Sequence, residues 1–343
     1  MATMRDVAAL ANVSAKTVSR VFNNDPHVTP ETKERVEAAL RELNYVPTTL
    51  ATTFRTGRAP VIGVAIPDIV DPFFGAIAKA AETLAAAHDM SVVITSLDDN
   101  PAREPAIVQS LLRQALSGLI IAPVSREHSY LKAWAARTPL VFVDRPPVGV
   151  LADSFTEDDY IGAYQATLHL IEHGHTRIGF LGDDISLPTS KSRLDGYRGA
   201  LNDQGIGYDE QLVSLGASDS VSAVRAFTAL DQLPQRPTAL FSSNANVTMH
   251  IVPVLQDSGL AVTAFGDFPM ADMLSPALTV IDQDPFALGT LAAQRILDRC
   301  AHPNRKFRRR TVLPVKLIER ESCMTSDRLD GTDRRPSKIK QPV

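Results

Sequence analysis

The spacing of apolar residues at the start of the chain predicts two short helices joined by a tight turn. Within residues 5–11 the apolar positions recur at helical spacing, at Val7, Ala8, Leu10 and Ala11. Asn12 and Val13 interrupt this pattern. Ser14 then offers a side-chain oxygen that can cap a second helix, predicted over residues 15–23.

The second predicted helix has two unlike faces. Val18, Val21 and Phe22 form an apolar face. The opposite stripe is small, cationic and hydrogen-bonding, and consists of Lys16, Ser19, Arg20 and Asn23. A third helix is predicted to start at Thr29-Pro30-Glu31, with Val36, Ala39, Leu40 and Leu43 on its buried side. The three helices are expected to share one core.

From residue 61 onward, apolar strand-like runs alternate with amphipathic helical stretches. This alternation is typical of parallel sheets covered by helices on both faces. Strands are predicted at 61–66, 91–96, 119–122 and 140–143 in one lobe, and at 177–181, 212–215, 238–241, 261–265 and 278–281 in a second. Ligands of such sheets bind beyond the carboxyl ends of strands, which directs attention to residues 68–74, 144–145, 182–184, 242–244 and 266–267.

Composition restricts the classes of protein that fit. A chain of 343 residues accommodates a small domain and a larger two-lobed one. The net charge of -4 argues against a uniformly basic nucleic-acid binder, so any DNA contact must come from a local surface. Cys300 and Cys323 fall in no metal-ligand or redox spacing, which suits a reducing cytoplasm. With no long apolar run, we expect neither export nor membrane insertion.

Catalytic and metal motifs are weak. His173-Gly174-His175 reads as a helix-to-strand turn rather than a metal site, and no phosphate-binding fingerprint or catalytic triad stands out. We therefore expect no enzyme activity, no cofactor and no metal. The alternative is a cytoplasmic solute-binding or sugar-metabolising α/β protein, which would not need the first sixty residues.

The two N-terminal helices have the form of a helix-turn-helix. Such a second helix enters the major groove of DNA, where cationic side chains donate hydrogen bonds to guanine and hydroxyl groups contact phosphates. Ala15, Lys16 and Arg20 are the candidate base readers. The alternative is that Lys16 and Arg20 form only a solvated face.

Longer motifs point to a family. The order M-R-D-V-A-A-L-A-N-V-S-A-K-T-V-S-R-V-F-N-N, followed by V-T-P-E-T-K-E-R-V, closely resembles the headpiece of LacI/GalR-family transcriptional regulators. I-P-D-I-V-D-P-F-F, R-L-D-G-Y-R-G-A-L and P-A-L-T-V-I-D-Q resemble that family's sensor body. The resemblance implies an N-terminal all-α helix-turn-helix headpiece (1–46), a hinge helix and linker (47–60), and an α/β periplasmic-binding-protein-like body of two parallel-sheet lobes (61–322). The polar tail, 323–343, is predicted to be disordered.

In N-Y-V-P-T-T-L-A-T-T-F-R-T-G the family places a hinge that becomes helical on operator DNA. The resemblance implies that Phe54 wedges into the minor groove, although a plain core role is the alternative. Thr48 and Thr52 replace a frequent Asn and a frequent basic residue, and threonines favour a hinge that folds only on DNA. The full predicted DNA-binding set is Ser14, Ala15, Lys16, Thr17, Ser19, Arg20, Asn23, Phe54 and Arg55.

The resemblance also implies a small-molecule effector, a sugar or related metabolite. The predicted effector-binding set is Phe73, Phe74, Asp144, Arg145, Arg193, Asn244 and Asp267. Phe73 or Phe74 would form a stacking wall. The Arg193 guanidinium can bind two ligand oxygens, and an interlobe salt bridge is its alternative role.

Two departures from the family pattern bear on the effector. Asn244-Ala245 stands where Asn-Asp is frequent, and Gly266 stands where an Asp often binds sugar hydroxyls. Three consequences remain open: a different or more anionic ligand, use of Asp267 instead, or loss of effector binding. The sequence thus predicts a homodimeric regulator of double-stranded operator DNA, usually a repressor, with an atypical sensor.

Overall fold

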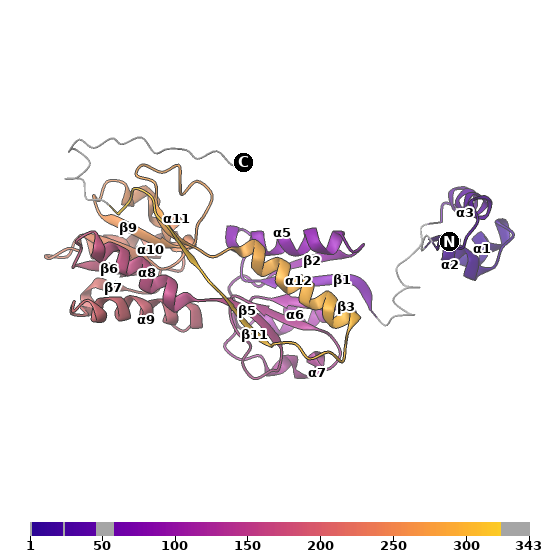
Figure 1. Ribbon diagram of the computed structural model, residues 1–343, viewed down its shortest axis with the longest axis horizontal. Helices are drawn as coiled ribbons and strands as arrows, with labels where there is room; N and C mark the ends of the chain where they lie inside the picture. The colour runs from indigo at the N-terminus through magenta and orange to yellow at the C-terminus, as the bar shows by residue number, and fades with distance from the viewer. Residues whose placement is uncertain (1, 23–24, 46–57, 324–343) are drawn as a thin grey trace. The chain divides into compact units, whose positions relative to one another are not determined.

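The computed structural model describes residues 2–22, 25–45 and 58–323 (Figure 1). The chain divides into two compact units, Met1–Ala59 and Pro60–Val343. The domain boundaries predicted after residues 46, 60 and 322 stay predictions, although the first strand of the body already begins at Ala59. Among the described helices, none is long and apolar enough to cross a membrane.

The described part of the first unit contains three helices: α1 (Met4–Leu10), α2 (Ala15–Phe22) and α3 (Pro30–Glu42). Their shared core is built from Val7, Ala8, Ala11, Val18, Val21, Val36 and Ala39. Thr3 caps α1 and Thr29 caps α3 through their side-chain oxygens. The predicted apolar face of the first helix is wrong at Leu10, whose side chain is 45% exposed and does not belong to the core that the three helices share.

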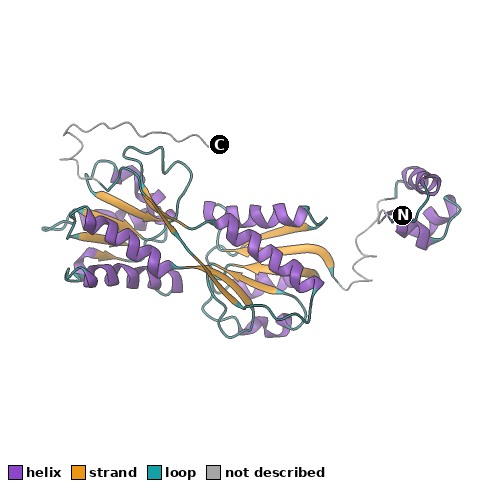
Figure 2. Cartoon of the chain, viewed as in Figure 1, coloured by secondary structure: helices purple, strands orange, loops and turns teal. Residues whose placement is uncertain are grey.

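The described residues of the second unit form two six-stranded sheets, each largely parallel (Figure 2). The first sheet has the order β11-β5-β4-β3-β1-β2 and comprises β1 (Ala59–Ile66), β2 (Ser91–Ser96), β3 (Leu116–Ile121), β4 (Leu140–Val143), β5 (Asp153–Glu157) and β11 (Arg310–Leu313). The second has the order β12-β10-β9-β8-β6-β7 and comprises β6 (Ile178–Leu181), β7 (Val213–Ser214), β8 (Ala239–Ser242), β9 (Ala261–Phe265), β10 (Thr279–Asp282) and β12 (Lys316–Ile318).

Helices cover both faces of each sheet. In the first lobe α5 (Pro72–Ala86) and α12 (Pro285–Ala301) pack on one face, and α6 (Glu104–Leu112) and α7 (Lys132–Ala135) pack on the other. In the second lobe α8 (Asp159–Glu172) and α9 (Pro188–Asp203) lie opposite α10 (Ser220–Asp231) and α11 (Ala245–Leu255). Alternate residues of a strand therefore enter different cores: Ile62 and Val64 face α5, whereas Ala65 faces α6.

The chain passes between the two lobes three times, from β5 to α8, from β10 to α12 and from β11 to β12. These passages explain the strands that the sequence pattern missed, namely β5, β11 and β12. β5 reads D-S-F-T-E, a polar run, yet all five residues are buried. Burial is possible because Arg299 donates two hydrogen bonds to Asp153, at 2.8 and 2.7 Å, and Gln283 donates one to Glu157 at 3.0 Å.

Candidate functional site

The outer face of α2 is open to solvent. Ser14 caps the helix, since its Oγ accepts a hydrogen bond from the Thr17 backbone N–H at 3.1 Å. Ala15, Lys16 and Arg20 are exposed, while Val18 is buried against the other two helices. The cap thus fixes the first turn of α2, and the side chains of Ala15, Lys16 and Arg20 extend from this helix into solvent.

Arg20 is held loosely by one acidic neighbour. Its Nε lies 3.5 Å from Asp25 Oδ2, and its side chain is 52% exposed. Hydrogen bonds from the backbone and side chain of His27 lower the pKa of Asp25, so the carboxylate is ionised at neutral pH. An exposed ion pair of this kind contributes little to stability, which leaves Arg20 able to exchange Asp25 for another partner.

Some predicted contacts cannot be placed. Asn23, Phe54 and Arg55 lie outside the described residues, as do Thr48 and Thr52. Within the described part of the set, Ser14, Ala15, Lys16, Thr17, Ser19 and Arg20 all belong to α2 or to the residue that caps it.

A cavity of about 300 Å³ lies in the body where the carboxyl ends of both sheets face one another. Both lobes contribute to its wall. Its polar lining consists of Asp68, Asp71, Asp99, Asp144, Arg145, Asp183, Asp184, Thr189, Arg193, Ser218, Asn244, Asn246, His250 and Gln283. Phe73 and Phe74 are among the apolar wall residues.

Arg193 is buried at the cavity wall. Its Nε donates to Asp159 Oδ1 at 2.7 Å, its Nη1 donates to the Ser243 carbonyl at 2.9 Å, and its guanidinium lies 3.8 Å from the centre of the Phe265 ring. Burial opposes the charge, but the carboxylate of Asp159, followed by those of Asp144 and Asp183, outweighs it and raises the pKa of Arg193. The ion pair joins α9 to α8 within the second lobe and is therefore not the interlobe bridge considered above.

The two phenylalanines have different surroundings. Phe74 is 6% exposed and belongs to the core of the first lobe, while Phe73 is half-buried and meets Phe74 edge-on at 5.1 Å between ring centres. Phe73 is therefore the better candidate for the stacking wall.

Asp144 and Arg145 stand together at the end of β4. Asp144 adopts a left-handed backbone conformation, with φ of +66°, and its Oδ2 lies 3.1 Å from Arg145 Nε. Arg145 Nη1 also donates to the Pro123 carbonyl at 2.8 Å. The guanidinium is thus fixed at the cavity wall with part of its charge already balanced.

Five further carboxylates line the cavity: Asp68, Asp71, Asp99, Asp183 and Asp184. The strand-end segments that contain Asp68, Asp71, Asp183 and Asp184 were predicted, but a role for these residues was not. Burial, together with the charges of Asp144, Asp99 and Asp68, raises the pKa of Asp71 to about 6. Asp71 also caps α5, since it accepts a hydrogen bond from the Phe73 N–H at 2.9 Å.

Comparisons with known proteins agree with this architecture. Residues 3–48 match the family model described as bacterial regulatory proteins of the lacI family, and residues 167–323 match a periplasmic binding protein-like domain. The Escherichia coli HTH-type transcriptional regulator GalR is 32% identical over 87% of this chain and 89% of its own. The chain belongs to the lacI family.

Two other members show how far the similarity extends. The ribose operon repressor of Haemophilus influenzae is 29% identical over 94% of this chain and 98% of its own. A crystal structure of the lac repressor dimer bound to operator and an anti-inducer superimposes with a TM-score of 0.81, at 27% identity over 94% of this chain and 99% of that one. This lacI-family chain is accordingly a DNA-binding transcription regulator and not an enzyme.

The two atypical positions of this lacI-family body now have a structural meaning. Gly266 has φ of +90°, and a Cβ there would lie 3.1 Å from both Ala245 Cβ and Gln283 Oε1. Ala245 and Gln283, which lie beside Gly266, both line the cavity. Glycine brings no carboxylate to this part of the wall. Other aspartates supply the acidic groups.

Asp267 and Asn244 differ in whether they line the cavity. Asp267 does not belong to the described cavity wall, and both of its carboxylate oxygens accept hydrogen bonds from Arg320, at 3.1 and 2.6 Å. Asn244 does line the cavity. It caps α11 by accepting from Val247 N–H at 2.7 Å, and its Nδ2 donates to Asp183 Oδ2 at 2.8 Å, so it positions Asp183.

Proposed function

We propose that this protein is a cytoplasmic transcriptional repressor that binds a pseudo-palindromic operator as a homodimer and is controlled by a polyhydroxylated effector carrying positive charge. The observation that carries the proposal is the acidic cavity lined by both lobes of a lacI-family chain. A ligand there touches both lobes at once, so it can favour one degree of closure over another.

The surface proposed for DNA contact is the outer face of α2. Lys16 and Arg20 present donors for guanine edges, Ala15 fits against a thymine methyl group, and the hydroxyls of Ser14, Thr17 and Ser19 suit phosphate oxygens. The similarity to a lac repressor dimer on its operator supports two such faces on adjacent half-sites.

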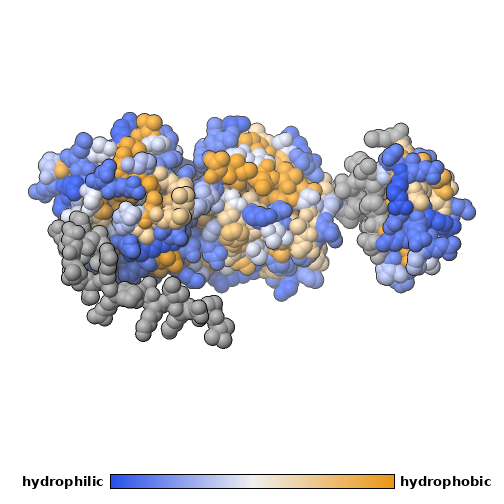
Figure 3. Space-filling view, turned by 90° about the horizontal axis from the view of Figure 1, so that it is seen from above, coloured by the Kyte–Doolittle hydropathy of each residue, from blue (hydrophilic) through white to orange (hydrophobic). Residues whose placement is uncertain are grey.

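A separate, apolar surface of the body supports self-association. Figure 3 shows apolar side chains gathered on the first-lobe part of the body, in a view from the side on which Figure 1 places α5. Ile69 and Val70, next to α5, are 52% and 79% exposed, and Ile94 on the neighbouring edge strand β2 is 38% exposed. A homodimer formed through α5 and β2 would cover these side chains.

The proposed positive charge of the effector follows from the excess of acidic over basic side chains in the cavity wall. Six aspartates and two arginines line the cavity, an excess of four carboxylates. Both arginines already face carboxylates, Arg145 that of Asp144 and Arg193 that of Asp159. Because the remaining groups are mainly acceptors, they suit hydroxyl donors and a protonated amine. The anionic ligand considered from the sequence is the alternative that this balance disfavours.

The effector experiment compares ligands that share one carbon skeleton but are neutral, positively charged or negatively charged. Full-length protein is screened by thermal shift at pH 7.5 with sets of a neutral sugar, its amino sugar and its sugar acid. We expect the largest rise in melting temperature with an aminated member, diminished by added salt and by Asp99→Asn. A uniform preference for the sugar acids would contradict the proposed ligand class and leave the repressor function standing.

The repressor function has its own test. Full-length protein is used to select duplexes from a random library, and operator binding is followed by fluorescence anisotropy with excess nonspecific DNA. We expect a pseudo-palindromic consensus bound by two chains, with affinity that falls steeply with salt. Selection of no consensus at all would contradict the function itself.

A further inference from the structure

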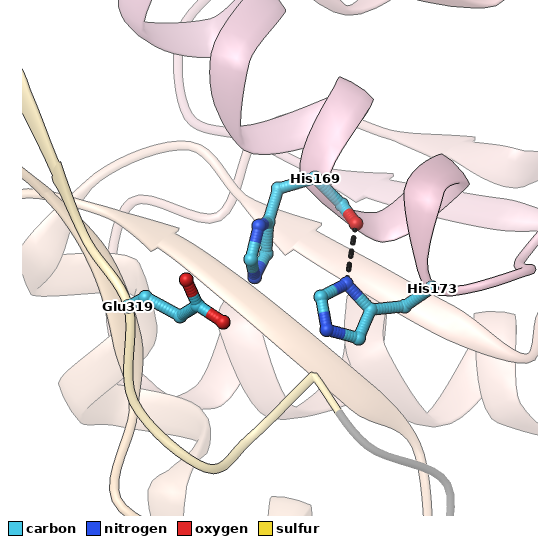
Figure 4. Close-up of side chains that lie close together, drawn as sticks. All are labelled: His169, His173 and Glu319. Carbon is cyan, nitrogen blue, oxygen red and sulfur yellow. Dashed lines mark hydrogen bonds between the residues drawn. The ribbon is translucent and has the colours of Figure 1, made fainter.

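Two histidines and a glutamate meet on the second lobe, outside the effector cavity (Figure 4). His169 lies in the last turn of α8, His173 is one turn later at the C-cap of that helix, and Glu319 follows β12. One potential ligand atom from each residue lies within 4.8 Å of the other two. The pair is therefore His169 and His173, spaced by four residues, rather than the His173-Gly174-His175 sequence dismissed above.

His169 is buried without a partner for one ring nitrogen. The residue is 6% exposed, and its Nε2 has no hydrogen-bond partner among the described residues. In Figure 4 this edge of the ring points toward the Glu319 carboxylate. A buried polar atom left unpaired is costly, and such an atom aimed into a cluster of donor groups calls for a ligand.

The His173 ring is held in an orientation that leaves its Nε2 available to a ligand. Its Nδ1 donates to the His169 carbonyl at 2.8 Å, which places the proton on Nδ1 and leaves the lone pair on Nε2. The ring centres of His169 and His173 are 4.4 Å apart.

We propose that His169, His173 and Glu319 bind a divalent transition-metal ion, with Zn²⁺ the ion that fits best. Two imidazole nitrogens and one carboxylate oxygen are a typical zinc donor set, and a water completes the tetrahedron. Tetrahedral zinc places its ligand atoms roughly 3.3 Å apart, and the exposed Glu319 side chain is free to close the remaining distance.

The bound ion would join two segments that arrive from the other lobe. α8 follows the passage from β5, and Glu319 follows β12, which is reached from β11. The metal would fix the end of β12 against the end of α8 and thereby stabilise the second lobe. This inference does not depend on the effector or on DNA binding.

The test measures zinc binding by untagged, full-length protein after removal of metals with a chelator. Equilibrium dialysis should give one Zn²⁺ per chain, and Co²⁺ in its place should give the visible absorption bands of a tetrahedral site. His173→Gln and Glu319→Gln each remove one ligand at a position that is not fully buried, so both variants should fold and bind zinc about tenfold or more weakly.

His88→Gln is the matched control. His88 is exposed and its Nδ1 also lies 3.0 Å from the carbonyl four residues earlier, that of Leu84, but among the described residues it belongs to no cluster of three potential metal ligands. This variant should bind zinc like the wild type. Zinc binding that is equal in the wild type, in His173→Gln and in Glu319→Gln would overturn the proposal, as would the lack of a tetrahedral cobalt spectrum.

Discussion

At the scale of single residues, Asp71 combines a helix cap with a place in the cavity wall. Its carboxylate caps α5 and lines the cavity, and its pKa of about 6 exceeds the ordinary value of 3.8. Because the folded state binds the proton more tightly than the unfolded chain does, ionised Asp71 costs stability above pH 6. This cost disappears as the pH falls toward 4.

Asp71→Asn should therefore stabilise the unliganded protein at pH 8 by about 1–2 kcal/mol. Asparagine keeps the cap oxygen and removes the charge. The free energy of unfolding in urea is measured at pH 8 and at pH 5, and the gain should shrink at the lower pH. A gain of equal size at both values would contradict the assigned cause.

Arg193 and Asp159 illustrate a buried pair whose members cannot be removed singly. Burial raises the pKa of Asp159 to about 6 even with Arg193 at 2.7 Å. Arg193→Ala leaves this carboxylate buried without its partner, so we expect a loss of about 3–5 kcal/mol in unfolding free energy.

The double variant Arg193→Met with Asp159→Leu should recover most of that loss, since it removes both charges and keeps apolar volume. Denaturation in urea at pH 7.5 compares the two variants. A double variant no more stable than Arg193→Ala would refute this account of the pair.

At the scale of elements, α2 is the helix on which DNA specificity is expected to rest. Arg20→Ala should reduce discrimination between operator and random DNA by about 1–3 kcal/mol, the value of one good base contact. Arg41→Ala removes the same charge from an exposed site at the end of α3 and is the control. Anisotropy titrations against both DNAs measure the ratio, and equal ratios for the two variants would remove Arg20 from the base readers.

Much of the element order could be predicted from apolar spacing. The strands β2, β4 and β9 have the predicted limits, because each is a compact apolar or β-branched run. β5 could not be predicted, since its burial depends on Arg299 and Gln283, which are more than a hundred residues away. The spacing of apolar residues within β5 cannot indicate partners that are so distant in the sequence.

The site could be predicted only in part, for the same reason. Arg193, Asn244 and Asp144 were found through the family resemblance, and all three line the cavity. The excess of carboxylates arises only when the ends of several strands converge. Glu319 likewise meets His169 across 150 positions of the chain, a proximity that no motif encodes.

At the scale of the whole molecule, the three passages between the lobes determine the order in which the lobes can be completed. The first lobe starts at β1, but α12, which supplies Leu288, Ala292 and Ile296 to its core, follows all but one strand of the second lobe. On a ribosome the first lobe to appear would thus wait for its last helix until the other lobe is nearly synthesised. A nascent chain interrupted before residue 285 would expose the surface of α5 and its neighbouring strands that α12 covers, so the first lobe would offer an apolar surface to chaperones until late in its synthesis.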